Sequence, residues 1–356
     1  MALPVVFVFA LIAARTTSCS AGDETVPSLP AHTACPGVSA PVGSQPPPVG
    51  NAEASNQYVV QTADPAVSRA GRLLNLSQPS QALEILLAAL QRHPHDPSVL
   101  MLAGLASYRS DQVRAALSYW WESLDLAPSE PLKAIYDDAQ RETAADRSND
   151  KLFSEHFAVR YEGAAMPADA ARSILATLEE DYSRISAQLG CVSSERIVAI
   201  VQSREQYLRA TSAAEWSGGH YDGRIHVAWD AGPHMQRALA HELVHACLAS
   251  LPSGSNPWPA WLQEGLAQKL SGDTLEPSAR EELRQLAVHH QVPRLENLGV
   301  DWFSLSRRDA VAAYNLSLAA ADALCDDYRS PGVRKILSNP EALPRITAYL
   351  DAQLGL

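Results

Sequence analysis

Lysine is scarce in this chain of 356 residues, and its basic residues form no cluster. Only four lysines occur, so arginine supplies nearly all of the positive charge. Acidic residues outnumber basic ones by 40 to 28, which gives a formal net charge of -12. Because binding to nucleic acid requires concentrated lysine and arginine, this charge pattern argues against nucleic acid as a partner.

The apolar run at the N-terminus is too short to span a bilayer. Residues 3–14 form a stretch of 12 residues, the usual length of the core of a signal peptide. We therefore expect residues 1–20 to direct export to the cell envelope. Cys19, in the stretch TTSCSAG, suggests a bacterial lipoprotein whose lipidated cysteine would tether the chain to a membrane. No basic residue precedes the run and Thr16 stands where leucine is usual, so simple secretion remains the alternative.

The sequence has no CxxC pair, so a zinc cluster held by thiolates is not expected. Besides Cys19, the chain contains Cys35, Cys191, Cys247 and Cys325. In an oxidising compartment some of these could form disulfides, but the sequence does not say which. We expect Cys247 to be a small, buried apolar residue.

The segment after the export signal has the composition of a linker. Residues 21–60 are rich in Pro, Ser, Ala and Gly and include three consecutive prolines at 46–48. Such a segment cannot bury enough apolar surface to fold, so we expect a disordered tether. Over the whole chain, 46% hydrophobic and 19% charged residues are typical of globular proteins.

Two stretches that lie 34 residues apart in the sequence are alike. These are PSQALEILLAALQRHP (79–94) and SDQVRAALSYWWESLDLAP (110–128), in which Ala82 aligns with Ala116 and a proline closes each stretch. The period and the pattern resemble tetratricopeptide repeats, which are pairs of helices. We expect about two repeats within residues 65–145, fewer than the ~3 that usually stand alone. The block should therefore pack on the next domain, either as a groove for a protein partner or as a spacer.

The hydrophobic pattern changes after this block. LFSEHFAVRYEG, RIVAIVQS and HYDGRIHVAW have the pattern of strands, whereas ADAARSILATLEEDYSRISAQLG and SREQYLRAT have the pattern of helices. Strands and helices that alternate in this way, followed only by helices, predict an α+β domain. We assign it to residues 150–335, with a C-terminal helix over residues 336–356.

The predicted helix MQRALAHELVHACLASL contains the motif HELVH. His241 and His245 are four residues apart and so lie one turn apart on one face of the helix. Two neutral imidazoles placed in this way can hold one zinc ion, and Glu242 between them can reach a water on that ion. Two core histidines without a metal are the alternative, but they would leave the acidic side chains of the region buried without a purpose.

A catalytic zinc usually takes three protein ligands and keeps one position for water. The candidate for the third ligand is Glu264, which eighteen residues separate from His245, in the stretch PAWLQEGLA. The stretch LPSGSNPWP before it predicts a loop, after which a second helix can fold back beside the first. Because Glu264 lies among apolar residues, an unpaired charge there would be costly, and a metal ion would remove that cost.

These motifs resemble the gluzincin zinc metallopeptidases, the thermolysin- and aminopeptidase-like group. The nearest likeness is to bacterial peptidase MA-like domains, which often adjoin tetratricopeptide repeats. The resemblance covers roughly residues 150–335. It implies a thermolysin-like domain, with a small mixed sheet that ends in an edge strand, followed by helices that bind one Zn²⁺ ion.

The resemblance also implies a role for each residue of the motif. His241, His245 and Glu264 would bind zinc, and Glu242 would be the general base that activates the zinc-bound water for attack on a peptide bond. Tyr314, in AAYNLSLAAADAL, matches the tyrosine that often stabilises the oxyanion.

Two further features are implied less directly. Residues 218–229 resemble the edge strand that pairs with the substrate backbone. Some members carry a carboxylate four residues after the distal glutamate that orients a zinc ligand, and Gln268 stands there in this chain.

The sequence leaves two other functions open. One is an interaction protein whose zinc only stabilises the fold, and the other is an amidase that acts on cell-wall peptides. We expect the remaining histidines of the region, His220, His226 and His234, to be surface or helix-capping residues.

Overall fold

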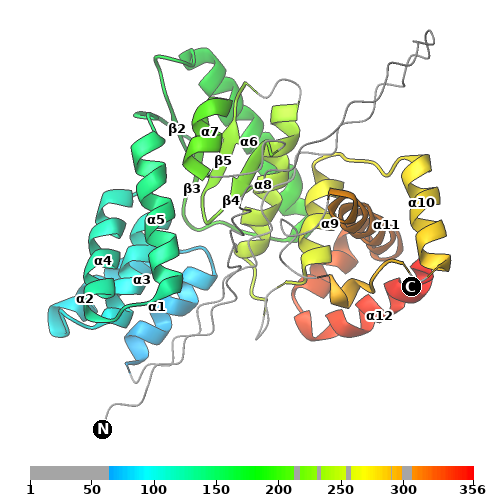
Figure 1. The fold of residues 1–356 in the computed structure, drawn as a ribbon, viewed down its shortest axis with the longest axis horizontal. Coiled ribbons are helices and arrows are strands. Elements are labelled where there is room, and N and C mark those ends of the chain that lie inside the picture. Colours follow the sequence, from blue (N-terminus) through cyan, green and yellow to red (C-terminus); the bar gives the residue numbers. More distant parts are fainter. Residues whose placement is uncertain (1–63, 212–216, 231–233, 254–257, 290, 299–306) are drawn as a thin grey trace, which may run out of the picture.

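The computed structural model describes residues 64–356 except 212–216, 231–233, 254–257, 290 and 299–306 (Figure 1). The predicted export signal and tether, with Cys19 and Cys35, lie outside the described residues. None of the helices in the described part of the chain is long and apolar enough to cross a membrane.

The N-terminal part of the described chain consists of five helices. They are α1 (Pro65–Asn75), α2 (Pro79–Arg92), α3 (Pro97–Arg109), α4 (Val113–Leu126) and α5 (Glu130–Ala145). Aspartates at 64 and 96 cap α1 and α3 by accepting hydrogen bonds from backbone N–H groups of the first turn. Each of these two helices packs on the helix that follows it, so the chain forms two successive hairpins.

The two hairpins have equivalent turns. Ser77 between α1 and α2 has φ 53°, and Asp111 between α3 and α4 has φ 60°. Ala82 and Ala116 both lie fully buried where the two helices of their hairpin meet. These pairs are separated by the same 34 residues that separate the similar stretches of sequence. The predicted helical repeat is thus present in the structure.

A five-stranded mixed sheet follows the helical block. Its strands are β1 (Asp150–Phe153), β2 (Phe157–Tyr161), β3 (Ile197–Gln202), β4 (Gly219–Tyr221) and β5 (Ile225–Ala228). Their spatial order is β1-β2-β3-β5-β4. β2, β3 and β5 run parallel, whereas each outer strand is antiparallel to its neighbour. The chain is therefore α+β, as predicted, and β4 forms one edge of the sheet.

Helices cover both faces of the sheet. On one face lie α6 (Ala168–Leu189) and α8 (Met235–Ala249), which share the main core with inward side chains such as Ile225 and Val227 of β5. On the other face lies α7 (Arg204–Thr211), which contacts β3, β5 and α5 of the helical block. Because side chains of a strand alternate between faces, His226 points toward α7 rather than α8.

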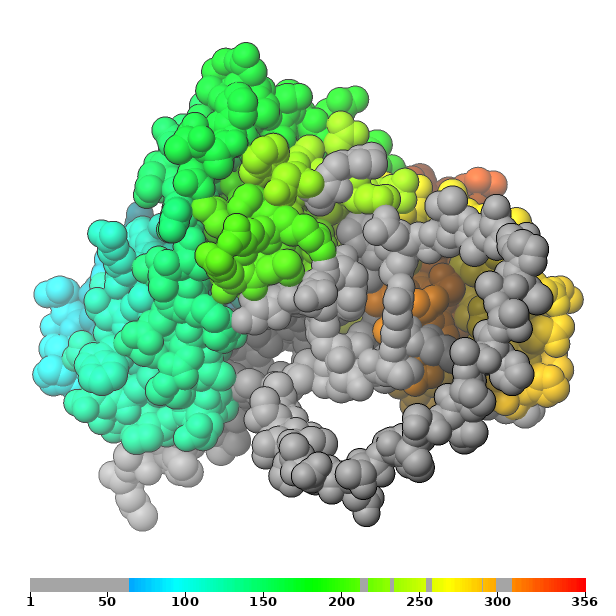
Figure 2. All heavy atoms as spheres, turned by 45° about the horizontal axis from the view of Figure 1, so that its top comes forward, coloured from blue at the N-terminus to red at the C-terminus, as the bar shows by residue number. Residues whose placement is uncertain are grey.

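The C-terminal part contains only helices in the described residues. These are α9 (Ala260–Leu270), α10 (Pro277–Val288), α11 (Arg307–Leu337), which has a break at Arg329, and α12 (Leu343–Leu354). α9 packs against α8 on one side and along α11 on the other. Figure 1 shows this group on the opposite side of the sheet from α1–α5, and Figure 2 shows the helical block in direct contact with the sheet region.

One prediction about cysteine was wrong. Cys247 is not a plain apolar residue, since it forms a disulfide with Cys191, with Cα atoms 5.4 Å apart. Both are buried, and they meet because Cys191 follows the end of α6, which packs on α8. Because they are 56 residues apart in the sequence, local patterns could not predict this pairing. Cys325 is a free, half-buried thiol.

Candidate metal centre

The two histidines of HELVH lie on the buried face of α8. This helix lies between the sheet and α9, so most of its side chains are enclosed. His241 is 1% and His245 5% exposed, and their ring centroids are 5.0 Å apart. The four-residue spacing therefore places both rings side by side in the interior, as the sequence predicts.

The third residue of the predicted site comes from α9. Glu264 is fully buried, and its two oxygens face the two rings. Oε2 lies 3.4 Å from Nε2 of His241, and Oε1 lies 3.6 Å from Nε2 of His245. One ligand atom from each residue lies within 4.8 Å of the other two. α9 thus brings Glu264 to the imidazoles of α8.

The polar atoms of this group have no hydrogen-bond partners among the described residues. They are both nitrogens of His241, Nε2 of His245 and both oxygens of Glu264. A buried polar group without a partner costs roughly 1–3 kcal/mol. Two ligand atoms each ~2.1 Å from a tetrahedral ion lie about 3.4 Å apart, close to the separations observed here. The three residues can hold a metal ion.

Burial shifts the pKa values of the three candidate ligands. It lowers the pKa of His241 to about 4, against a weak opposing effect of Asp273, and lowers the pKa of His245 to about 4. Burial also raises the pKa of Glu264 to about 7, with His245 opposing the change. Both imidazoles are therefore neutral at pH 7, and a neutral imidazole is the form that binds a metal.

Glu242 lies directly beside the edge strand. It is fully buried, and neither of its oxygens has a hydrogen-bond partner in the described structure. A Cβ added to Gly219 of β4 would lie 3.0 Å from Cγ and 3.1 Å from Oε1 of Glu242. Glycine at this position lets β4 pass close to the carboxyl group. Burial, and then the charge of Glu264, raise the pKa of Glu242 well above its ordinary value.

Tyr314 of α11 also lies at the centre. It is 4% exposed, and burial raises the pKa of its hydroxyl well above the ordinary value. The charges of Glu264 and then Glu242 raise this pKa further, which places the phenol within electrostatic reach of both carboxyls. The structure thus brings His241, His245 and Glu264 together, with Glu242 buried on the same helix as the two histidines and Tyr314 buried on α11.

Gln268 does not orient an imidazole in the described structure. Its Nε2 donates to the backbone oxygens of Glu264 and Tyr314, at 3.3 and 3.0 Å, and so joins α9 to α11. Besides Glu264, Asp273 acts electrostatically on His241, and Asp273 pairs with Arg237 at 3.2 Å. Asp273 could not be predicted from the sequence, because it follows the end of α9 and belongs to no motif.

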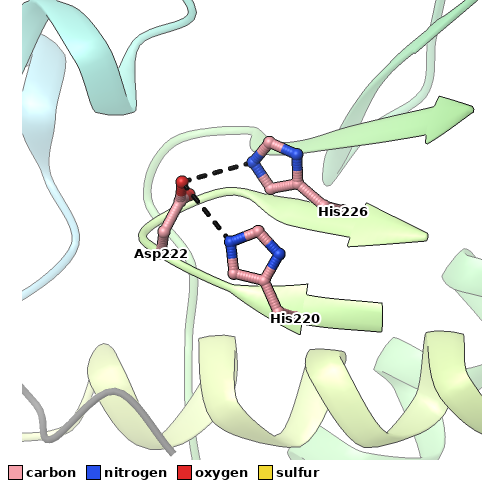
Figure 3. A group of neighbouring side chains, drawn as sticks. All are labelled: His220, Asp222 and His226. Carbon is pink, nitrogen blue, oxygen red and sulfur yellow. Dashed lines mark ion pairs between the residues drawn. The ribbon is translucent and has the colours of Figure 1, made fainter. Parts of the chain in front are cut away.

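The interpretation of two other histidines was wrong. His220 of β4 and His226 of β5 are 6% and 1% exposed, not surface residues, and they form a second cluster with Asp222 (Figure 3). They were missed because a short strand with alternating polarity normally exposes its polar face. Here α7 packs on that face, and Glu142 of α5 reaches Arg224 in the turn. His234 directly precedes α8 as predicted, but it is half-buried and its side chain makes no capping hydrogen bond.

Comparison of the chain with protein-family models, curated proteins and solved structures finds no match. The chemistry of the buried residues is thus the basis for assigning a function.

Proposed function

We propose that this protein is an exported zinc-dependent peptidase of the gluzincin type. His241, His245 and Glu264 would hold one Zn²⁺ ion, and Glu242 would act as the general base. The proposal rests on one observation. Two imidazoles and a carboxylate converge in the interior, and the atoms that face one another have no hydrogen-bond partner among the described residues. A second carboxyl group without a hydrogen-bond partner there, that of Glu242, lies next to them.

The ligand set favours zinc over the hard cations. Ca²⁺ and Mg²⁺ are bound by oxygen atoms, whereas two imidazoles and one carboxylate form a common ligand set of catalytic zinc. Zinc held in this way supplies a Lewis acid and lowers the pKa of a bound water toward ~7. Three protein ligands leave a position for that water, so this set supports a catalytic rather than a purely structural ion.

Glu242 supports hydrolysis because a site that only stabilises the fold does not need a second acidic side chain beside its ligands. Its high pKa in the absence of a cation makes it a strong proton acceptor once ionised. It would accept the proton of the attacking water and pass it to the leaving amine of the peptide bond. Tyr314 would donate a hydrogen bond to the oxyanion that forms on the carbonyl.

The edge strand supports a peptide substrate. β4 ends the sheet in the described residues, and an extended peptide can add to a sheet edge through its backbone. Gly219 places that edge beside Glu242. A peptide bound along β4 would therefore pass the general base, in the arrangement that the likeness to thermolysin-like domains implies.

The disulfide supports export. Disulfides persist in oxidising compartments such as the bacterial periplasm and the cell surface, and Cys191–Cys247 lies within the proposed catalytic part. This agrees with the export signal expected over residues 1–20. A lipid on Cys19 would keep the protein at the membrane, behind the proline-rich tether.

The test is a peptide-library assay of the wild-type protein and of Glu242→Gln, each with its zinc content measured. We expect the wild type to cleave peptides in a chelator-sensitive way. Glu242→Gln should keep one zinc at the site and lose about 10²–10⁴-fold in rate, the usual contribution of a general base. Equal rates for the two proteins would disprove the role of Glu242, and cleavage of cell-wall fragments alone would indicate an amidase.

A further inference from the structure

The β4–β5 hairpin carries a second group of possible metal ligands, on the face of the sheet away from Glu242. His220 and His226 are directly opposite each other in the two strands, and Asp222 lies in the connecting turn. Their rings stack with centroids 4.5 Å apart and an angle of 20° between planes. Figure 3 shows both rings pointing away from the underlying helix and toward Asp222.

The ligand atoms have the spacing of a metal site. Nε2 of His226 lies 3.3 Å and Nε2 of His220 3.7 Å from the same oxygen, Oδ2 of Asp222. These separations bracket the ~3.4 Å expected between two ligands of one tetrahedral ion. One ligand atom from each residue lies within 4.8 Å of the other two.

His226 is the second, independent indication of a ligand. Its ring is 1% exposed, and neither of its nitrogens makes a hydrogen bond to any described residue. The contact with Asp222 is short, but it lacks the geometry of a hydrogen bond. Nε2 of His226 and the carboxylate of Asp222 are thus close together but do not point at each other. Both can instead point at one ion between them. An unsatisfied buried imidazole is costly, and a bound cation would satisfy it.

The side chains around the cluster carry more negative than positive charge, which favours a bound cation. The hydroxyl of Tyr108 lies 2.7 Å from Oδ2 of Asp222 and 2.8 Å from Oε2 of Glu142, but it has one proton to donate. Arg224 is the cation that both carboxylates share, at 3.3 and 2.7 Å. Arg160 approaches Glu142 at 3.8 Å, but it also pairs with two further carboxylates. Lys151 pairs with one of these two, Asp111, at 2.8 Å. Four carboxylates thus share three cations among the described residues, so one negative charge is left without a cation of its own.

We propose that His220, Asp222 and His226 bind a second divalent transition-metal ion, separate from the site on α8 and α9. Imidazole and carboxylate ligands suit Zn²⁺ and related ions. This ion would join the two strands at their turn and neutralise the charge shared by Asp222 and Glu142. It would also hold β4 in place, since Gly219 on the same strand lies against Glu242. Its role is to position the edge strand and not to react with substrate.

The test counts metal ions in four proteins loaded with excess Zn²⁺, gel-filtered and examined by native mass spectrometry. We expect two ions in the wild type, one in His245→Ala, one in His226→Ala and none in the double variant. His156→Ala is the matched control, because His156 is a half-buried histidine paired with Glu179 at 2.7 Å and should leave two ions bound.

The outcomes separate this inference from the proposed function. One ion in the wild type, and none in His245→Ala, would overturn the second site and leave the peptidase proposal intact. Two ions in His245→Ala would instead contradict the site on α8. If His226→Ala fails to fold, Asp222→Asn keeps the side-chain size, and its count must also fall by one. A count of two in Asp222→Asn would overturn the inference.

Discussion

At the scale of single residues, the function depends on buried groups that the fold leaves unsatisfied. The side chains of His241, His245, Glu264 and Glu242 are 0–5% exposed, yet most of their polar atoms have no hydrogen-bond partner in the described structure. Protein interiors normally satisfy such groups. These groups are an exception, which indicates that a ligand binds them. Their burial also determines how the stability of the metal-free protein should change with pH.

The stability of the metal-free protein should fall as pH rises above ~6.5. Between about 4 and 6.5 the histidines favour folding as pH rises, because they gain protons on unfolding. Glu264 opposes this between its ordinary value and a pKa of about 7, because its folded form holds the proton more tightly. Burial also raises the pKa of Glu242 well above its ordinary value, so Glu242 acts in the same direction as Glu264.

Thermal unfolding at several pH values, with chelator and with Zn²⁺, measures this effect. The chelated protein should lose melting temperature as pH rises from 6.5 through about 7, whereas zinc should remove the loss by neutralising both carboxylates. If the melting temperatures of the chelated and the zinc-bound protein change with pH in the same way, zinc does not bind at these carboxyl groups.

Tyr314 should contribute to rate and not to metal binding. Tyr314→Phe removes only the hydroxyl, and loss of one oxyanion donor typically lowers kcat by about 10²–10³-fold. Zinc content and KM should change little. Tyr349→Phe serves as the control, because this tyrosine is 49% exposed and bonds to Asp327. Equal kcat values for the two variants would remove Tyr314 from the mechanism.

At the scale of secondary-structure elements, the site depends on how α8 is held. α8 packs on α6 and α9, and the disulfide from Cys247 begins two residues after His245. A disulfide between residues that lie 56 positions apart is expected to stabilise the folded state by about 2–4 kcal/mol.

Replacing both Cys191 and Cys247 with serine should therefore lower the midpoint of denaturant unfolding by an amount equal to about 2–4 kcal/mol. A reducing agent should lower it in the wild type in the same way. Cys325→Ser is the matched control, since this thiol is free and only half-buried. If the control loses as much stability as the double variant, the disulfide is not what stabilises the folded state.

Much of this arrangement could be predicted from local patterns. The i, i+4 histidines, the loop before Glu264 and the alternating strands depend on spacing and periodicity, which a single sequence contains. The Cys191–Cys247 disulfide and the cluster around Asp222 depend on which helices cover which face of the sheet. His226 has the local pattern of an exposed strand residue, and only packing by distant helices makes it buried.

At the scale of the whole molecule, the helical block is fastened to the sheet by buried charges. Arg224 of the β4–β5 turn is fully buried, stacks on the ring of Tyr108 at 3.7 Å and pairs with Glu142 at 2.7 Å. Tyr108 belongs to α3 and Glu142 to α5. The helical repeat therefore packs on the following part of the chain, as two repeats too few to stand alone would require.

Removing one partner of this pair should be costly. Glu142→Gln leaves the guanidinium of Arg224 without its nearest charge, and breaking a buried pair typically costs about 3–5 kcal/mol. Denaturant unfolding measures the loss. Glu122→Gln is the control, because its pair with His95 is exposed and such pairs contribute at most about 1 kcal/mol. Equal stability of Glu142→Gln and wild type would show that this contact does not hold the two parts together.

The most direct test of the account is anomalous diffraction at the zinc absorption edge from crystals of the purified protein. We predict a peak bounded by Nε2 of His241, Nε2 of His245 and the carboxylate of Glu264. The peak should vanish in crystals of His245→Ala. Density that shows these three side chains in place with no anomalous peak, after growth with zinc, would contradict the account.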